Sequence, residues 1–132
     1  MTVGHGGSTR GGVLLRVDGA LAFVPAASVH GIVAMPPITP VPGRHEPLLG
    51  IAEVGNAVIS VLGLGGTGAS HGMLVVAKHA GEQVGLAGVE VIGTGHYDVD
   101  ASAPDCVRVD GERVPSLDVG AIYDRVKSAA WG

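Results

Sequence analysis

Short apolar runs, separated by turn-forming residues, recur along most of the chain. The longest apolar stretch, Pro47–Leu64, holds two such runs, Leu48–Val54 and Ala57–Leu64, on either side of Gly55-Asn56. Glycine and asparagine adopt positive φ at low cost, so this pair predicts a tight hairpin turn between two strands. The second run is apolar at almost consecutive positions, which predicts a strand buried on both faces.

The remaining pattern predicts a protein built mainly of strands. Asp18-Gly19 and Asp110-Gly111 are favourable hairpin turns. The polar stretch Thr94–Asp105 is expected to be irregular, and Asp118 is a good N-cap for a helix over residues 118–130. Short strands at this spacing indicate an all-β barrel or a pair of barrels. The other expected strands are Val13–Val17, Leu21–Val24, Val29–Met35, Met73–Lys78, Gln83–Ala87, Val89–Gly93, Val107–Val109 and Arg113–Leu117.

Glycines and prolines mark the connections between these runs. Residues 1–12 are glycine-rich and polar, which predicts a flexible tail ahead of a single domain over residues 13–130. Gly31 lies inside an expected strand, where a glycine marks a bulge or a close approach of another backbone. The segment Pro36–Pro42 is expected to be an extended connection, because its prolines lack the backbone N–H that a central strand needs.

Composition narrows the possible functions. The chain has 132 residues, of which 46% are hydrophobic and 15% charged, so it can bury a core and part of its surface is expected to be covered by a partner. A net charge of −4 leaves no basic footprint for nucleic acid. The N-terminus lacks the apolar core of a signal peptide, and no apolar run reaches the roughly 18 residues of a membrane span. We therefore expect a cytoplasmic protein without direct membrane insertion.

The glycine-rich run Gly63–Gly68 is the strongest lead towards an enzyme. Its spelling matches a dinucleotide-binding glycine loop, with Glu90 as the acidic residue further along the chain. Such a site requires a helix directly after Gly68, whereas Ala69–Lys78 contains a glycine and two adjacent valines, which disfavour a helix. The alternative is a loop between two barrels. The six histidines show no metal-ligand spacing, so neither a metal nor another cofactor is expected.

Three stretches resemble the chemotaxis coupling proteins, the CheW-like family. They are VHGIVAMPPITPVPGRHEPLLGIAEVGNAVISVLGL from Val29, MLVVAKHAGEQVGLAGVEV from Met73 and VRVDGERVPSLDVGAIYDRV from Val107. The resemblance implies two small five-stranded SH3-like barrels, over roughly residues 13–64 and 73–118, followed by the C-terminal helix. It also implies a non-enzymatic adaptor of bacterial chemotaxis signal transduction. Such an adaptor couples the cytoplasmic tip of chemoreceptors to the regulatory domain of a histidine kinase.

Departures from the family pattern fall on the central hairpin and the strand before the prolines. Where the family usually reads asparagine-leucine-arginine-glycine, this chain has Glu53-Val54-Gly55-Asn56, so Gly55 replaces an arginine that contacts partners. Gly31 stands where the family often has a glutamate. The alternative is therefore a CheW-like localisation module with other partners.

Apolar side chains on these strands are the candidate partner contacts. If they are exposed beside Gly55, they form a groove for a receptor tip or a partner barrel, with Glu53 at its rim. If they are buried, they are core residues. The expected partner-binding residues are Val29, Gly31, Ile32, Val33, Glu53, Val54, Gly55, Asn56 and Ile59, and no catalytic residue is expected.

Overall fold

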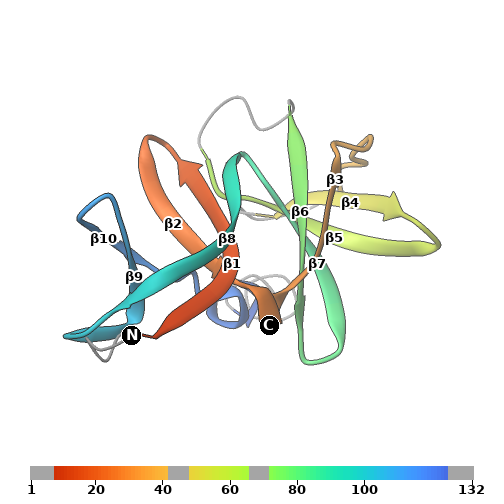
Figure 1. The fold of residues 1–132 in the computed structure, drawn as a ribbon. Coiled ribbons are helices and arrows are strands. Elements are labelled where there is room, and N and C mark those ends of the chain that lie inside the picture. Colours follow the sequence, from red (N-terminus) through yellow and green to blue (C-terminus); the bar gives the residue numbers. More distant parts are fainter. Residues whose placement is uncertain (1–7, 42–47, 66–71, 125–132) are drawn as a thin grey trace.

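The computed structural model describes residues 8–41, 48–65 and 72–124. Ten strands make up most of this part of the chain, together with a 3-10 helix at Ala26–Ser28 and a helical segment at residues 119–124 (Figure 1). The strands are β1 Thr9–Val17, β2 Ala20–Pro25, β3 Val29–Ala34, β4 Leu48–Val54, β5 Ala57–Gly63, β6 Met73–His79, β7 Glu82–Ala87, β8 Glu90–Asp100, β9 Ala103–Val109 and β10 Glu112–Pro115.

The strands form two five-stranded sheets that lie side by side (Figure 1). The first sheet has the order β10-β9-β8-β1-β2, and the second has the order β3-β6-β7-β5-β4. All neighbours are antiparallel except β5 and β7. The expected all-β architecture is confirmed. The expected division at residues 64 and 73 does not coincide with the sheets, because β1 and β2 pair with the C-terminal strands while β5 and β6 share one sheet.

Each sheet has one isolated β-bridge that brings its two outer edges together. In the first sheet, Phe23 of β2 bridges Ser116, and the Leu117 N–H donates to the Phe23 carbonyl at 2.8 Å. In the second sheet, Thr39 and Ile51 exchange two backbone hydrogen bonds of 2.8 and 2.9 Å. Thr39, a residue of the proline-rich connection that is not itself a proline, therefore uses its N–H to pair with the outer edge of β4, and this contact curves the second sheet towards a barrel.

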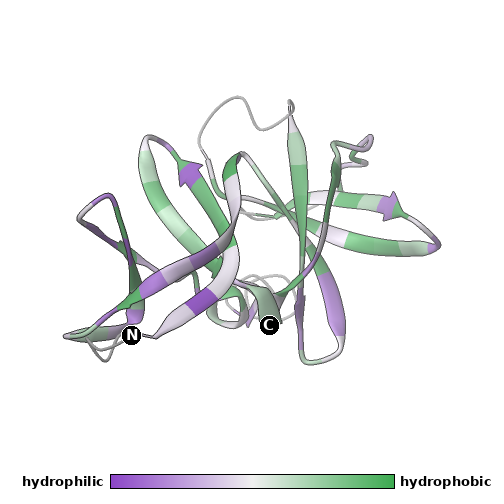
Figure 2. Ribbon diagram, viewed as in Figure 1, coloured by the Kyte–Doolittle hydropathy of each residue, from purple (hydrophilic) through white to green (hydrophobic). Residues whose placement is uncertain are grey.

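The core explains why several strands are apolar at consecutive positions. Leu14, Phe23, Val107 and Val114 pack inside the first sheet, a second cluster packs inside the second sheet, and a larger cluster joins the two sheets. Successive side chains of a strand point to opposite faces, so a strand that lies between the joining cluster and the cluster of its own sheet is buried on both sides. Strands β1, β6 and β7 accordingly colour as hydrophobic over their inner parts (Figure 2). The cluster between the sheets contains Val13, Leu15, Val24, Leu62, Val75, Ala77, Val84, Leu86, Val89 and Val119.

Two polar, glycine-rich segments that we expected to be irregular are strands. Residues 9–12, expected to belong to the tail, pair with β8, so that Thr9 lies opposite Asp98 and Gly12 opposite Gly95. Most of residues 94–105 lies in β8 and β9 for the same reason. The backbones of residues 9–12 and of β8 hydrogen-bond to each other although they are more than eighty residues apart in the sequence. Local propensity does not reveal such a distant pairing. The first seven residues of the expected tail lie outside the described residues.

The central stretch corrects three further expectations. Strand β5 is buried on both faces only towards its end, where the consecutive residues Val61 and Leu62 are fully buried, whereas Val58 near its start is 66% exposed. Gly63 ends β5 and the next described strand is β6 of the same sheet, so the intervening segment does not join the two sheets. Residues 66–68 of the glycine run lie outside the described residues. The dinucleotide-binding alternative is nevertheless wrong, because Met73–His79 is a strand where that site needs a helix, and Glu90 pairs with Arg16 at 3.3 Å.

The C-terminal helix begins as predicted. The Asp118 Oδ1 atom accepts a hydrogen bond from the Ala121 N–H at 2.9 Å, which is the geometry of an N-cap. The helix lies below and between the two sheets in Figure 1, and Val119 packs into the core that joins them. Residues 125–130 of the expected helix lie outside the described residues. Among the residues described, there is no helix whose length and hydropathy would suffice for a membrane span.

Candidate functional site

An open groove of about 610 Å³ lies on the second sheet, between β3 and the β4–β5 turn. We refer to it as the β3–β5 groove. It brings together six of the nine candidate partner-binding residues. These are Gly31, Ile32 and Val33 from β3, and Val54, Gly55 and Asn56 from the hairpin. Because the two segments are far apart in the sheet order, they meet only through the curvature of the sheet.

Four further residues line the β3–β5 groove. His30 and Ala57 adjoin predicted residues, whereas Val76 and Gln83 come from β6 and β7, which lie between β3 and β5 in the sheet. Val76 is 1% exposed and packs into the core of the second sheet. Sequence reasoning missed these two, because strand order decides which residues lie beneath the groove. Val76 and Gln83 could have been predicted only if the pairing of β3 with β6, and of β6 with β7, had been known.

The described lining of the groove is poor in charge. Among the described residues it contains no aspartate, glutamate, lysine or arginine, and its polar side chains are those of His30, Asn56 and Gln83. Gln83 Nε2 lies 3.5 Å from His30 Nε2. Since uncharged surface has little to lose on leaving water, the groove is suited to binding an apolar segment of another molecule.

The two glycines of the groove leave space above the backbone. A Cβ atom added to Gly31 or to Gly55 would meet no atom of the described residues within 4 Å, apart from those of its two neighbours in the chain. Gly55 has φ of +62° in the β4–β5 turn, which explains a glycine there. Gly31 lies next to a register shift between β3 and β6, so the predicted bulge is confirmed, but its φ is not positive.

Three candidate residues lie outside the groove. Ile59 is only 4% exposed and packs in the core of the second sheet, so the expectation that it is a surface contact is wrong. Val29 is half-buried and packs against the cluster between the sheets. Glu53 lines a different hollow of about 360 Å³, beside Ile51 and Val58, because neighbouring residues of β4 point to opposite faces.

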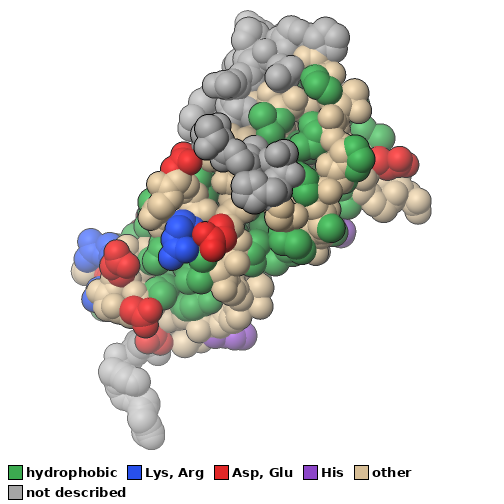
Figure 3. Space-filling model, turned by 90° about the horizontal axis from the view of Figure 1, so that it is seen from above, with side chains coloured by type: hydrophobic (Ala, Val, Ile, Leu, Met, Phe, Trp, Pro, Cys, Tyr) green, Lys and Arg blue, Asp and Glu red, His purple; other side chains and the backbone are tan. Residues whose placement is uncertain are grey.

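Charge is distributed unevenly between the two sheets. The strands of the second sheet carry three charged side chains, Glu53, Lys78 and Glu82, whereas those of the first sheet carry nine. Figure 3 shows apolar side chains gathered over the second sheet and most charged side chains over the first. The exposed apolar residues Ile51 and Val58 belong to this same sheet. The second sheet is therefore the more suitable of the two for apolar contacts with a partner.

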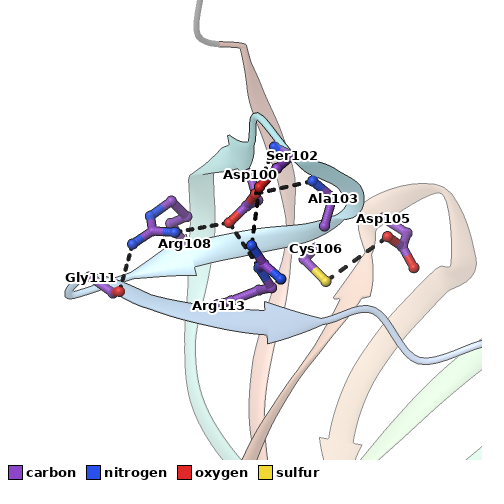
Figure 4. A network of polar contacts seen from close by, with 8 residues as sticks. All are labelled: Asp100, Ser102, Ala103, Asp105, Cys106, Arg108, Gly111 and Arg113. Carbon is purple, nitrogen blue, oxygen red and sulfur yellow. Dashed lines mark hydrogen bonds and ion pairs between the residues drawn. The ribbon is translucent and has the colours of Figure 1, made fainter.

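The network of polar contacts around Asp100 has a structural role. Asp100, 2% exposed, ends β8 (Figure 4), and its Oδ1 accepts hydrogen bonds from Ser102 N and Oγ, both at 2.8 Å, and from Ala103 N at 3.0 Å. Its Oδ2 accepts from Arg108 Nη1 at 2.9 Å and from Arg113 Nε at 3.1 Å. Bonds from Ser102 and the two guanidinium groups hold the pKa of Asp100 far below its ordinary value. Every carboxylate oxygen is engaged, so the cluster ties the β8–β9 turn to β10 and leaves no free acid or base.

The described part of the chain offers no arrangement for a metal centre. No group of three histidine, cysteine or acidic side chains is close enough to hold an ion among the residues described. The single cysteine, Cys106, is buried in β9.

Comparison with known proteins agrees with this reading of the fold. Residues 11–127 match the protein-family model of the CheW-like domain. A similar solved structure is the crystal structure of the scaffolding protein TtCheW from Thermoanaerobacter tengcongensis, with a TM-score of 0.71 and 16% sequence identity. The alignment covers 85% of this chain and 90% of that chain. No curated protein matches the chain significantly.

Proposed function

The chain belongs to the CheW-like family, a family of non-enzymatic scaffolding domains, and from this premise we propose that it couples chemoreceptors to a histidine kinase. It would do so through protein contacts alone, with the cytoplasmic tip of a receptor on one side and the regulatory domain of the kinase on the other. Its place would be the cytoplasm, where binding to receptors recruits it to their arrays.

The observation that supports this proposal best is the β3–β5 groove. An adaptor needs a surface that is preformed, open and poor in charge, because affinity in a protein contact comes mainly from a compact apolar centre. The groove combines apolar groups of β3 and of the hairpin, and it lies on the sheet with few charges. We propose that Gly31, Ile32, Val33, Val54, Gly55 and Asn56 contact a partner there. Val29 would support β3 from behind, and Glu53 would limit the choice of partner at the neighbouring hollow.

A bridging experiment tests the adaptor function directly. A receptor tip fragment from the same organism is immobilised, and the isolated regulatory domain of a histidine kinase is added with and without this chain. The kinase domain should be retained only when the chain is present. Isothermal titration with each partner alone should show that the chain binds both.

The outcomes separate the adaptor from its alternative. Binding to both partners at once supports coupling, and binding to one partner that excludes the other contradicts it. If the folded chain binds neither partner, the adaptor function is wrong and a CheW-like localisation module with other partners is favoured. Circular dichroism of the same sample shows whether the strands are intact.

A further inference from the structure

The segment from Ser116 to Asp124 contacts both sheets, and we refer to it as the strap. It begins on the first sheet, where the Ser116 N–H donates to the Asp105 carbonyl at 3.2 Å. The next residue follows the same pattern, because the Leu117 N–H donates to the Phe23 carbonyl at 2.8 Å. Since Phe23 lies in β2 and Asp105 in β9, backbone hydrogen bonds attach the start of the strap to two strands of that sheet.

The other end of the strap lies on the β6–β7 hairpin of the second sheet. Gly120 packs against the ring of His79, since a Cβ at Gly120 would lie 2.6 Å from His79 Cε1. The Tyr123 hydroxyl donates a hydrogen bond to Glu82 Oε1, and Asp124 Oδ1 lies 3.8 Å from His79 Nε2. His79 and Glu82 are opposite each other in β6 and β7. Three residues of the strap therefore contact two residues at the end of one hairpin.

The glycine at position 120 is explained by this contact and not by its backbone conformation. Gly120 has no positive φ, so alanine could adopt the same backbone. A glycine weakens a helix relative to alanine. The helical part of the strap therefore loses intrinsic stability at the position where it approaches the ring of His79.

Other connections between the sheets do not by themselves set the angle between them. Among the described connections, Ala26–Ser28 leads from β2 to β3, and Gly88-Val89 leads from β7 to β8. Two bodies joined at two points can still rotate about the line through those points, as in a hinge. The apolar cluster between the sheets opposes their separation, but apolar attraction has no preferred direction. The strap adds directional hydrogen bonds on both sheets, and Val119 at its centre packs into that cluster.

We propose that the strap holds the two sheets at one fixed angle, and that the cluster between the sheets does not do so alone. A molecule bound to the second sheet then keeps a constant orientation relative to one bound to the first. The inference goes beyond the proposed adaptor function, because it concerns the chain alone and holds or fails without any partner.

Distances between spin labels on the two sheets test the inference. Glu112→Cys in β10 and Val58→Cys in β5 place one label on each sheet, at side chains that are exposed. Cys106→Ala removes the native thiol. Double electron–electron resonance of this labelled chain should give a single narrow distance distribution. A broad or two-peaked distribution would overturn the inference, because the angle would then vary with the strap intact.

Gly120→Ala in the labelled chain disturbs the strap at one point. The added Cβ displaces the ring of His79 or lifts the helix, and either change removes the contact with the hairpin. Alanine favours a helix more than glycine does, so a weaker helix cannot explain the result. The distance distribution should broaden or shift. Addition of His79→Ala supplies the missing space, so in the double variant the distribution should return towards that of the unsubstituted strap.

Gly95→Ala is the matched control. Gly95 lies in β8 with no positive φ, and an added Cβ would meet no described residue within 4 Å beyond its chain neighbours. The distribution should stay narrow in this variant. An unchanged distribution in Gly120→Ala, with circular dichroism showing intact strands, would overturn the inference, because the cluster would then suffice. Equal broadening in Gly95→Ala would overturn it as well.

A second variant decides the matter if Gly120→Ala does not fold. His79→Ala combined with Tyr123→Ala removes the ring contact and the hydrogen bond to Glu82 without crowding any residue. A broader distribution in this folded variant supports the strap, and an unchanged one refutes it. The bridging experiment with receptor and kinase fragments is independent of all these measurements, so a failure of the adaptor function leaves their outcome intact.

Discussion

Replacement of Gly55 by aspartate separates the role of this residue in the turn from its role in the groove. The backbone at Gly55 has φ of +62°, and a Cβ there would meet nothing within 4 Å, so the side chain itself fits. Only the first residue of this two-residue turn has a positive φ, which is the pattern of a type II′ turn with glycine at its first position, and a side chain held there costs about 1–3 kcal/mol. We expect the free energy of unfolding to fall by about 1–3 kcal/mol, out of the roughly 5–15 kcal/mol usual for a domain.

The same substitution should affect binding far more strongly. It introduces a carboxylate into an uncharged groove that a partner would cover. Covering a charge that gains no opposite charge costs several kcal/mol, and here the open groove leaves part of the hydration in place. A cost of about 2–4 kcal/mol corresponds to about 30- to 1,000-fold weaker binding.

Two measurements and two control variants separate the effect of Gly55→Asp on stability from its effect on binding. Urea unfolding followed by circular dichroism gives the stability, and isothermal titration with the kinase domain or the receptor tip gives the affinity. Gly19→Asp places the same residue at a positive-φ glycine of the β1–β2 turn, at φ of +85° and with no described residue beyond its chain neighbours within 4 Å, so it shows whether a strained turn away from the groove affects binding. Gly55→Asn retains the size of the side chain and removes the charge.

The reasoning is refuted if Gly55→Asp binds as the wild type does, or if Gly19→Asp weakens binding equally. A Gly55→Asp variant that does not fold would show that Gly55 is only a turn residue. If Gly55→Asn binds more tightly than Gly55→Asp, the difference between the two variants is the effect of the charge, and the loss that remains in Gly55→Asn is the effect of side-chain size and of the turn.

Three further predictions concern the fold. Hydrogen bonds depress the pKa of Asp100. Its contribution to stability is therefore complete above the unfolded pKa of about 3.8 and declines as pH falls towards the folded pKa. In urea titrations, Asp100→Asn should have a lower free energy of unfolding at neutral pH than the wild type, and that free energy should fall less in acid. A hydrogen bond to Glu82 raises the pKa of Tyr123 to about 12, so its contribution is complete below the unfolded pKa of 10.0 and is lost as pH rises through about 12. Phenolate absorbance should show that late titration, and Tyr123→Phe should abolish it. Gly12→Ala would place a Cβ 2.3 Å from the Val24 carbonyl oxygen and should lower the free energy of unfolding by about 1–3 kcal/mol, whereas an unchanged urea midpoint would contradict the crowding.

Features that depend on neighbouring residues were predictable from the sequence. The turns at Asp18-Gly19 and Asp110-Gly111 have positive φ at both residues, as their chemistry predicts. The N-cap at Asp118 and the bulge at Gly31 were likewise found, because each depends on a few adjacent residues. The order of these short elements also supports the family resemblance, which the family match over residues 11–127 bears out.

Features that depend on distant pairing were not predictable. The strand at residues 9–12 exists because β8 lies beside it, and the sheets draw on strands from both ends of the chain. The same holds for the candidate site. Apolar sequence alone did not distinguish Ile59, which is buried, from Val58, which is exposed, and it did not place Val76 and Gln83 beneath the groove.

The sequence by itself therefore determined the strand class, the turns, the family and most residues of the β3–β5 groove. The tertiary structure decided which of the candidate residues reach the surface, which sheet each strand joins, and that the groove is open, with no acidic residue, lysine or arginine in its described lining. The physical reason is that propensity and turn chemistry act over a few residues. Burial and strand order instead arise from contacts between β3, β6, β7 and the β4–β5 hairpin, which meet only when the second sheet curves on itself.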